Sequence, residues 1–273
     1  MHTFTKHILL LSTFTAVTSA AFTNAPRFVC CATDDSYQAR PDEHAPISVM
    51  GDHTHYKSGW MMSYRTMHMD MDGMRYGTDR VSSGDAFVEG YTVTPESMTM
   101  DMHMLGLMYA PTDKLTLMLM GNYTEMKMDH RIFSQMGADM INNGDTKFTT
   151  ETSGIGDIKL GGLYRFYLKE TRKAHLGLSL SLPTGSIDEK DQIPAMGGPA
   201  NQQLPAPMQL GSGTYDLLPS LTYVQQFDNW SYGAQANAVI RLESENDNGY
   251  RLGDVWGATT WVGTNLSEWI GLN

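Results

Sequence analysis

Methionine is the residue type in this sequence whose number and spacing point most directly to chemistry. The chain has 273 residues and 21 methionines, and 15 of these lie between Met61 and Met128. Within this window methionine recurs at every second position, which is the side-chain period of a β-strand. Thioether sulfur is a soft ligand that selects Cu(I) and similar ions, such as Ag(I), over hard cations. The spacing therefore predicts rows of soft-metal ligands, each row on one face of a strand.

A short histidine motif precedes the methionine-rich window. His53 and His55 form a His-x-His pair, with His44, Met50 and Asp52 close to it in the sequence. Imidazole suits copper as well. His53 and His55 are therefore candidate metal ligands, and the alternative is that they belong to a solvated arm.

The elements that must position these residues are β-strands. From residue 58 onward the sequence alternates between apolar and polar residues, and no segment keeps the i, i+3, i+4 apolar spacing of a helix. Nine strands are expected, the last of them short. Their ranges are 58–72, 96–110, 114–129, 155–168, 174–183, 214–227, 230–242, 250–263, and a strand that begins near Ser267.

The connections between these strands alternate in length. The short turns are 111–113, 169–173, 228–229 and 264–266, and the longer links are 73–95, 130–154, 184–213 and 243–249. Short periplasmic turns and long external loops are typical of outer-membrane barrels. The sequence therefore predicts an all-β protein, an antiparallel transmembrane β-barrel of the outer-membrane type, over residues 57–273.

The expected strand count is unusual for this class. Single-chain bacterial barrels have even strand numbers, and a crossing strand needs about nine to eleven residues. The favoured interpretation is that the sequence is a truncated version of a longer protein whose barrel closes with further strands. A missed or split strand, or a strand supplied by the N-terminal arm, would also explain the count.

Composition limits the kind of partner. The formal net charge of −11 argues against a nucleic-acid partner, because phosphate binding needs a basic patch. The mean hydropathy of −0.32 excludes a bundle of transmembrane helices. It does not exclude a barrel, in which only alternate residues meet lipid. Outer-membrane lipid is therefore the expected partner, and the oligomeric state is open.

The N-terminal residues have the features of a secretory signal peptide. Lys6 gives a cationic start, residues 8–17 are apolar, and small residues follow up to Ala20 and Ala21. We predict a signal peptide over residues 1–21 and a flexible periplasmic arm over residues 22–56. Export to the outer membrane of a Gram-negative cell follows from this assignment.

The alternation assigns each strand two faces. In residues 114–129 the leucines and Tyr123 share one face, which suits lipid, and the asparagine, threonines and methionines share the other, which suits a lumen. The same rule places Asp101 and His103 on the outer face, above the hydrocarbon band. The candidate soft-metal ligands are Met61, Met67, Met69, Met71, Met98, Met100, Met102, Met104, Met118, Met120, Met126, Met128, His53 and His55, and Met108 shares their face.

Several segments resemble a known family. Residues 156–164 (GDIKLGGLY), 178–185 (LSLSLPTG) and 211–219 (GSGTYDLLP) are similar to the meta-pathway phenol-degradation family of outer-membrane transporters. Residues 45–53 (APISVMGDH), followed by 59–65 (GWMMSYR), resemble a methionine-rich branch of that family. The likeness covers about residues 44–273 and implies an outer-membrane channel for small solutes. The family name suggests aromatic hydrocarbons.

Three functions compete at this point. The first is a channel with a methionine-lined lumen that binds or passes a soft metal ion such as Cu(I) or Ag(I), with no resident cofactor. The second is a channel for small aromatic or apolar solutes, because methionine also lines promiscuous apolar surfaces and fills irregular space. The third is a structural or adhesion barrel that acts through loops 130–154 and 184–213. The motifs of zinc hydrolases, phosphate loops and serine hydrolases are absent from the sequence, so we do not expect an enzyme.

Overall fold

The protein is described here by a computed structural model. The structure describes residues 42, 44–133, 137, 139, 141, 142, 144, 146–267 and 270–272. The predicted signal peptide, residues 1–21, and most of the predicted arm lie outside these residues. Within the described part of the chain, no helix is long and apolar enough to cross a membrane. Nearly all regular structure is strand, so the predicted all-β fold is confirmed.

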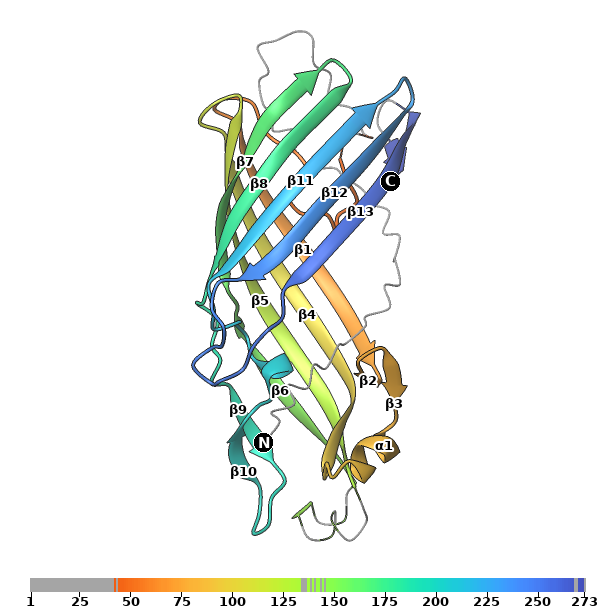
Figure 1. Cartoon of the computed structure of the whole chain (residues 1–273), viewed down its shortest axis with the longest axis vertical. Helices are drawn as coiled ribbons and strands as arrows, with labels where there is room; N and C mark the ends of the chain where they lie inside the picture. The colour runs from red at the N-terminus through yellow and green to blue at the C-terminus, as the bar shows by residue number, and fades with distance from the viewer. Residues whose placement is uncertain are drawn as a thin grey trace.

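The strands form one curled antiparallel sheet, as expected for an outer-membrane type of architecture (Figure 1). Its order is β1-β4-β5-β7-β8-β11-β12-β13-β14, and β6 pairs with β5 beside β7. The strands are β1 (Trp60–Asp72), β4 (Val93–Tyr109), β5 (Leu115–Ile132), β6 (Lys147–Ile155), β7 (Ile158–Lys169), β8 (Arg172–Leu182), β11 (Asp216–Gln226), β12 (Trp230–Arg241), β13 (Val255–Ser267) and β14 (Ile270–Leu272). All of these except β6 were predicted from the alternation.

The two ends of the sheet differ in the length of their connections. Short turns join β4 to β5, β7 to β8 and β11 to β12 at one end, which is the upper end in Figure 1. The long connections at the other end contain small elements of their own. These are β2 (Met74–Tyr76), β3 (Asp79–Val81), α1 (Ser83–Val88), β9 (Lys190–Ile193), β10 (Ala200–Gln203) and the 3-10 helix η2 (Ala206–Met208). The predicted alternation of short turns and long links is confirmed for these connections. The short turn predicted at 264–266 is wrong, because these residues belong to β13.

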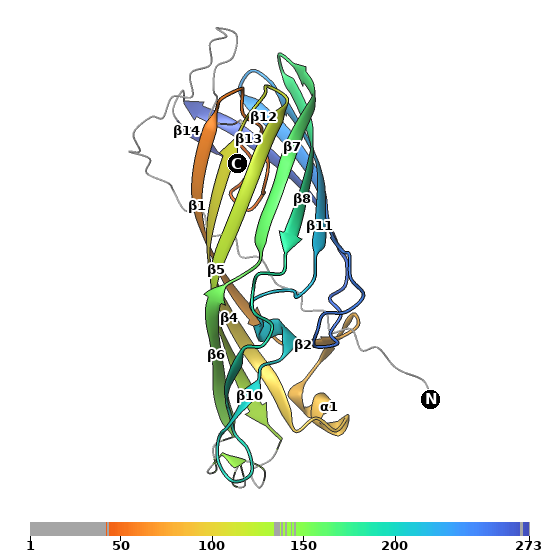
Figure 2. The same ribbon diagram turned by 90° about the vertical axis from the view of Figure 1, so that its left-hand side faces the viewer.

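The faces of the sheet follow the predicted alternation. Along β1 the side chains alternate between half-buried and exposed without interruption. The exposed side chains near the short-turn end are large and apolar, for example Trp60, Met62, Leu107 and Leu119. Their neighbours in sequence face the inside of the curl, which Figure 2 shows from the side. The convex face is therefore apolar here, as expected of a surface in contact with lipid.

The strands β4 and β5 continue beyond this apolar surface toward the long loops. On the convex face the residues that follow Tyr64 in β1 and Tyr123 in β5, and those that precede Leu105 in β4, are polar. There His68 contacts Asp101 at 2.6 Å. The predicted outer-face position of Asp101 is confirmed, because its side chain is half exposed.

The strand β6 was missed because it lies entirely in this polar extension. Its sequence, KFTTETSGI, has Lys147, Thr149, Glu151 and Ser153 on one face and mostly threonine on the other. Both faces are polar, so the apolar–polar alternation used to find the other strands is missing. Its pairing with the long β5, from Tyr123 to Arg131, makes it part of the sheet.

Candidate functional site

The residues just before β1 lie inside the curl of the sheet. We call residues 44–57 the inner segment; residues 44–56 belong to the predicted arm, and residue 57 to the predicted barrel (Figure 2). The Nε2 atom of His175 on β8 donates to the carbonyl oxygen of Gly51 at 2.8 Å. The side-chain amide of Gln235 on β12 donates to the carbonyl oxygen of Met50 at 3.0 Å. This packing was not predicted from the sequence.

The first strands of the sheet hold the same segment from the other side. Arg65 on β1 donates to the carbonyl oxygens of Ile47 and Val49 at 3.1 and 3.2 Å. The backbone N–H of His55 donates to the hydroxyl of Thr116 on β5 at 3.0 Å. Because its partners come from β1, β5, β8 and β12, the inner segment crosses the concave face from one wall to the other.

A small apolar cluster anchors the start of the inner segment. Ala45 and Val49 pack against Val224 of β11 and Trp261 of β13, and all four side chains are buried. The Trp261 ring lies directly over Gly233, where an added Cβ atom would be 2.1 Å from a ring carbon. Only glycine at this position leaves room for the indole, so the anchor depends on this cross-strand pair.

The methionines of the first three strands form a continuous array on the concave face, which we call the methionine ladder. At its short-turn end Met61, Met108 and Met118 are direct cross-strand neighbours. At its far end Met71, Met98 and Met128 are neighbours in the same way. The ladder consists of Met61, Met67, Met69, Met71, Met98, Met100, Met102, Met104, Met108, Met118, Met120, Met126 and Met128. Neighbours within a row are about 5 Å apart at Cβ, and rows follow one another at about 7 Å.

A cavity of about 20 Å³ lies where the inner segment meets the methionine ladder. This volume has room for about one water molecule or one monatomic ion. Among the described residues, its lining combines thioethers with one imidazole, of His53, and one carboxylate, of Asp52. The lining residues are Met50, Gly51, Asp52, His53, Met61, Ser63, Arg65, Met104, Leu105, Gly106, Met108, Met118 and Met120.

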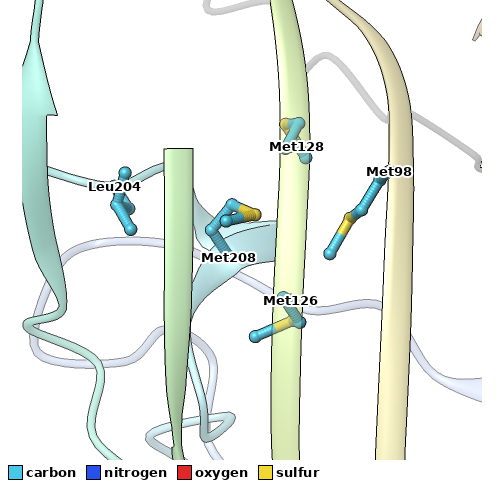
Figure 3. Packing of buried hydrophobic residues seen from close by; sticks show 5 residues of the cluster. All are labelled: Met98, Met126, Met128, Leu204 and Met208. Carbon is cyan, nitrogen blue, oxygen red and sulfur yellow. The ribbon is translucent and has the colours of Figure 1, made fainter. Parts of the chain in front are cut away.

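The far end of the ladder is covered by the loop between β8 and β11. Met98, Met126 and Met128 form a buried cluster with Leu204 and Met208 of that loop (Figure 3). The side chain of Met208 is fully buried in it. These five side chains fill apolar space against one another, which is the structural use of methionine.

The predicted metal ligands therefore fall into four groups. The ladder residues at the cavity are Met61, Met104, Met118 and Met120. The ladder residues in or against the buried cluster are Met71, Met98, Met100, Met126 and Met128. The half-buried residues between these two groups are Met67, Met69 and Met102. His53 and His55 lie in the inner segment.

Asp52 joins two histidines next to the cavity. Its carboxylate lies 2.8 Å from Nδ1 of His53 and 3.5 Å from Nδ1 of His44, and it also accepts the backbone N–H of Ala45. Burial alone would raise the pKa of the Asp52 carboxyl, but the hydrogen bonds and charges of His44 and His53 outweigh burial and hold it well below its ordinary value. Asp52 is therefore a buried carboxylate, the charged form that a metal ligand needs.

His55 lies beside this group. Its ring is 4.9 Å from the ring of His53, in an edge-to-face arrangement. Burial, with the nearby charges of His53 and His44, lowers the pKa of His55 to about 4. The imidazole is therefore neutral at neutral pH, and its Nε2 atom is buried without a hydrogen-bond partner among the described residues.

The concave face opposite the ladder is polar rather than sulfur-rich. Ser179 and Ser181 of β8, Thr222 of β11 and Gln235 of β12 are buried there. Hydroxyl and amide groups suit a hydrated lumen. The inside of the curl thus has one wall lined by thioethers and an opposite wall lined by hydroxyl and amide groups.

The segments that carry the family resemblance meet at one carboxylate. Asp157, just before β7, accepts the backbone N–H of Gly185 at 2.9 Å and that of Ser212 at 2.8 Å. The three residues come from the three resembling segments, and they fix both ends of the β8–β11 loop. The sequence gave no signal for this contact.

Comparison with known proteins gives a distant structural likeness. No family model and no curated protein matches the sequence. Among solved structures, the chain is similar to the crystal structure of an outer membrane channel from Pseudomonas putida F1, with 16% sequence identity and a TM-score of 0.49. The match covers 82% of this chain and 72% of the channel.

Proposed function

We propose that this chain forms an outer-membrane channel whose methionine ladder binds and passes a soft metal ion such as Cu(I) or Ag(I). The observation that carries the proposal is the continuity of the ladder. Its rows run along β1, β4 and β5 from the half-buried Met67, Met69 and Met102 to the cavity at Met61 and Met118. Conduction needs several weak sites in succession rather than one tight site. Rows of thioethers about 7 Å apart fit this requirement.

The location in a membrane is supported by the convex face. Large apolar side chains near the short-turn end are exposed, among them Leu117, Leu119, Leu176 and Leu178. A contiguous apolar surface of this kind marks contact with lipid or with a partner. The polar concave wall and the short-turn/long-loop pattern favour lipid, because outer-membrane strands are apolar outside and polar inside.

The size of the cavity favours an ion over an organic solute. A cavity that binds benzene has a volume of about 150 Å³, whereas the cavity at the inner segment has about 20 Å³. One dehydrated monatomic ion fits this space, and an aromatic ring does not. The thioether lining then sets the class of ion, because sulfur ligands select Cu(I) and its analogues.

The proposal is tested by Ag(I) and Cu(I) binding to the full-length protein in detergent, measured by competition with a colorimetric chelator. The test variant carries Met61→Leu, Met104→Leu, Met118→Leu and Met120→Leu, which keep the side-chain volume. We expect its Cu(I) and Ag(I) affinity to fall by at least about tenfold. Even the loss of a residue that only hydrogen-bonds to a metal ligand costs about 10- to 100-fold in metal affinity.

The matched control is Met62→Leu. Met62 lies next to Met61 in sequence but on the convex face, with 74% of its surface exposed. Unchanged Cu(I) affinity is expected for this control. Wild-type affinity in the four-residue variant would contradict the proposal.

The buried cluster at the far end of the ladder favours a second candidate, a channel for small apolar or aromatic solutes. There, Met98 and Met126 contact carbon-rich side chains such as Leu204, as at promiscuous apolar surfaces. Uptake of phenol into vesicles that contain the protein separates the two candidates. This candidate predicts faster phenol entry that excess Ag(I) does not change.

A further inference from the structure

We propose that His44, Asp52 and His53 form a separate binding site for one divalent transition-metal ion, of the Cu(II) or Zn(II) class. One ligand atom from each of the three residues lies within 4.8 Å of the others. The site uses nitrogen and oxygen donors, whereas the proposed Cu(I) path uses thioethers. It therefore goes beyond the proposed function, and it can be present or absent independently of the methionine ladder.

The ligand set determines the class of ion. Two imidazoles and a carboxylate suit zinc and divalent copper, and carboxylate is a poor partner for Cu(I). Asp52 also supplies a negative charge in a buried position, with 6% of its side chain exposed. A divalent cation would compensate that charge, because a buried carboxylate needs a cationic or hydrogen-bonding partner.

The distances are close to those of an assembled site. In a tetrahedral site with bonds of about 2.0 Å, ligand atoms are about 3.3 Å apart. His53 and Asp52 are already 2.8 Å apart, and His44 and Asp52 are 3.5 Å apart. To assemble the site, His53 has to move slightly away from Asp52, and the two imidazoles have to approach each other. His44 has 56% of its side chain exposed, so a rotation of this residue meets little obstruction.

The fold of the inner segment brings the three residues together. The Asp52 carboxylate accepts the N–H of Ala45 and so closes the turn that joins His44 to His53. Gly51 adopts a positive φ of 63°, which reverses the chain just before Asp52. The contacts to the sheet from Arg65, His175 and Gln235 that hold this turn go to backbone carbonyls of Ile47, Val49, Met50 and Gly51. None of these contacts uses the side chains of His44, Asp52 or His53.

One feature next to the turn points to a ligand besides the three side chains themselves. The Nε2 atom of His55 is buried without a hydrogen-bond partner among the described residues, although its ring lies 4.9 Å from that of His53. A buried polar atom without a partner calls for a bound water or ion nearby. The cationic group that faces the cavity is Arg65, which is engaged by the carbonyl oxygens of Ile47 and Val49.

The alternative is that the three residues form a hydrogen-bonded clasp that binds no metal. Both possibilities explain why His44 and His53 contact Asp52. They differ in the response to metal. A clasp would not bind Zn(II), whereas a metal site would bind one Zn(II) ion per chain in a saturable way.

The experiment measures Zn(II) binding to the full-length protein by calorimetry and Cu(II) binding by electron paramagnetic resonance. Wild type is expected to bind one ion per chain, with nitrogen hyperfine splitting in the Cu(II) spectrum. The His44→Gln variant tests the site with the least risk to folding, because its imidazole is half exposed. His44→Gln/His53→Gln is the stronger test. For the double variant we expect Zn(II) affinity to fall by at least about 100-fold. Removing a residue that only hydrogen-bonds to a metal ligand usually costs about 10- to 100-fold, and here two ligands are lost.

The matched control is His103→Gln. His103 is a histidine of β4 whose Nδ1 atom lies 2.8 Å from the hydroxyl of Tyr64, on the convex face and away from the inner segment. It should keep wild-type Zn(II) affinity. Equal affinity in wild type and in both His44 variants would overturn the proposal, as would an equal loss in His103→Gln.

The outcome is separable from that of the Cu(I) proposal. Met61→Leu/Met118→Leu should lower Cu(I) affinity and leave Zn(II) binding unchanged. Loss of Zn(II) binding in that variant would show that there is one mixed site instead of two, and would overturn the assignment of a nitrogen–oxygen site.

Discussion

The Nε2 atom of His175 lies 2.8 Å from the carbonyl oxygen of Gly51, across the inside of the sheet. A strand in the middle of the sheet thus holds residues that are more than a hundred positions away in sequence. The hydrogen bond is partly buried, and the loss of its donor would leave a carbonyl without this partner. Such a loss costs about 1–3 kcal/mol.

The inner segment should therefore loosen in a His175→Leu/Gln235→Leu variant. Both substitutions remove side-chain donors to the backbone of the segment, at Gly51 and Met50. We expect faster cleavage within residues 44–57 by added protease and a larger ion conductance in planar bilayers. His103→Leu, on the convex face, should change neither. Wild-type conductance and wild-type cleavage in the double variant would show that the segment is held by other contacts.

A second prediction concerns the anchor of the inner segment. In Gly233→Val the new side chain would overlap the Trp261 ring, which already lies 2.1 Å from the position of a Cβ atom. The ring must leave its contacts with Ala45 and Val49. We expect a loss of about 1–3 kcal/mol in unfolding free energy, the usual cost of overpacking, measured by denaturant unfolding.

The control for that variant is Gly121→Ala. An added Cβ atom at Gly121 would have no atom within 4 Å. If both variants unfold at the same denaturant concentration as wild type, the contact between Trp261 and Gly233 does not anchor the segment.

A third prediction concerns the loop that covers the far end of the methionine ladder. Met208→Ala removes a fully buried side chain from the cluster with Met98, Met126 and Met128. Truncation of a buried methionine costs about 2–5 kcal/mol. Hydrogen exchange should therefore speed up in residues 187–210 and remain slow in β7 and β8. Met196→Ala is the control, since that side chain is 75% exposed.

A fourth prediction concerns Asp157. In Asp157→Ala, the N–H groups of Gly185 and Ser212 lose their shared acceptor, so both ends of the β8–β11 loop are released together. Hydrogen exchange at these two residues should rise by a similar factor, because one group holds both. Asp188→Ala, within the same loop, is the comparison. A rise at only one of the two residues would show that the ends are held independently.

The sequence alone predicts the positions of the strands, and the face on which each side chain lies, wherever one face of the strand is apolar. The alternation of Met61 with Met62, or of Leu119 with Met118, assigns each residue a side, and the structure confirms these sides. Period-2 hydrophobicity is a local signal that arises from burial of one face only. It fails for β6, where both faces are polar and the pairing with β5 is set by the neighbouring strand.

The inner segment could not be predicted for a different reason. The sheet binds it mainly through carbonyl oxygens at Ile47, Val49, Met50 and Gly51, and a backbone carbonyl is the same in every residue. Its donors, such as His175, stand alone in leucine-rich strands and have no motif. The proximity of His44 and Asp52 to His53 was visible in the sequence, but the turn that joins them depends on these distant contacts.

The length of β5 has a consequence for how the chain tolerates change. The strand continues from Tyr123 to Ile132, about 30 Å at the rise of a strand, past the last exposed leucine of its outer face. In the proposed outer-membrane channel, the apolar first half of this strand would be exposed to hydrocarbon and its polar second half to water. A lysine introduced at Leu119 would cost about 2–4 kcal/mol, the price of a cation at mid-membrane depth, whereas Lys127 on the same face already pairs with Glu151 in water. A lysine on this face is therefore destabilising at position 119 and favourable at position 127. Tyr123 marks the boundary between the apolar and polar parts of the outer face of β5.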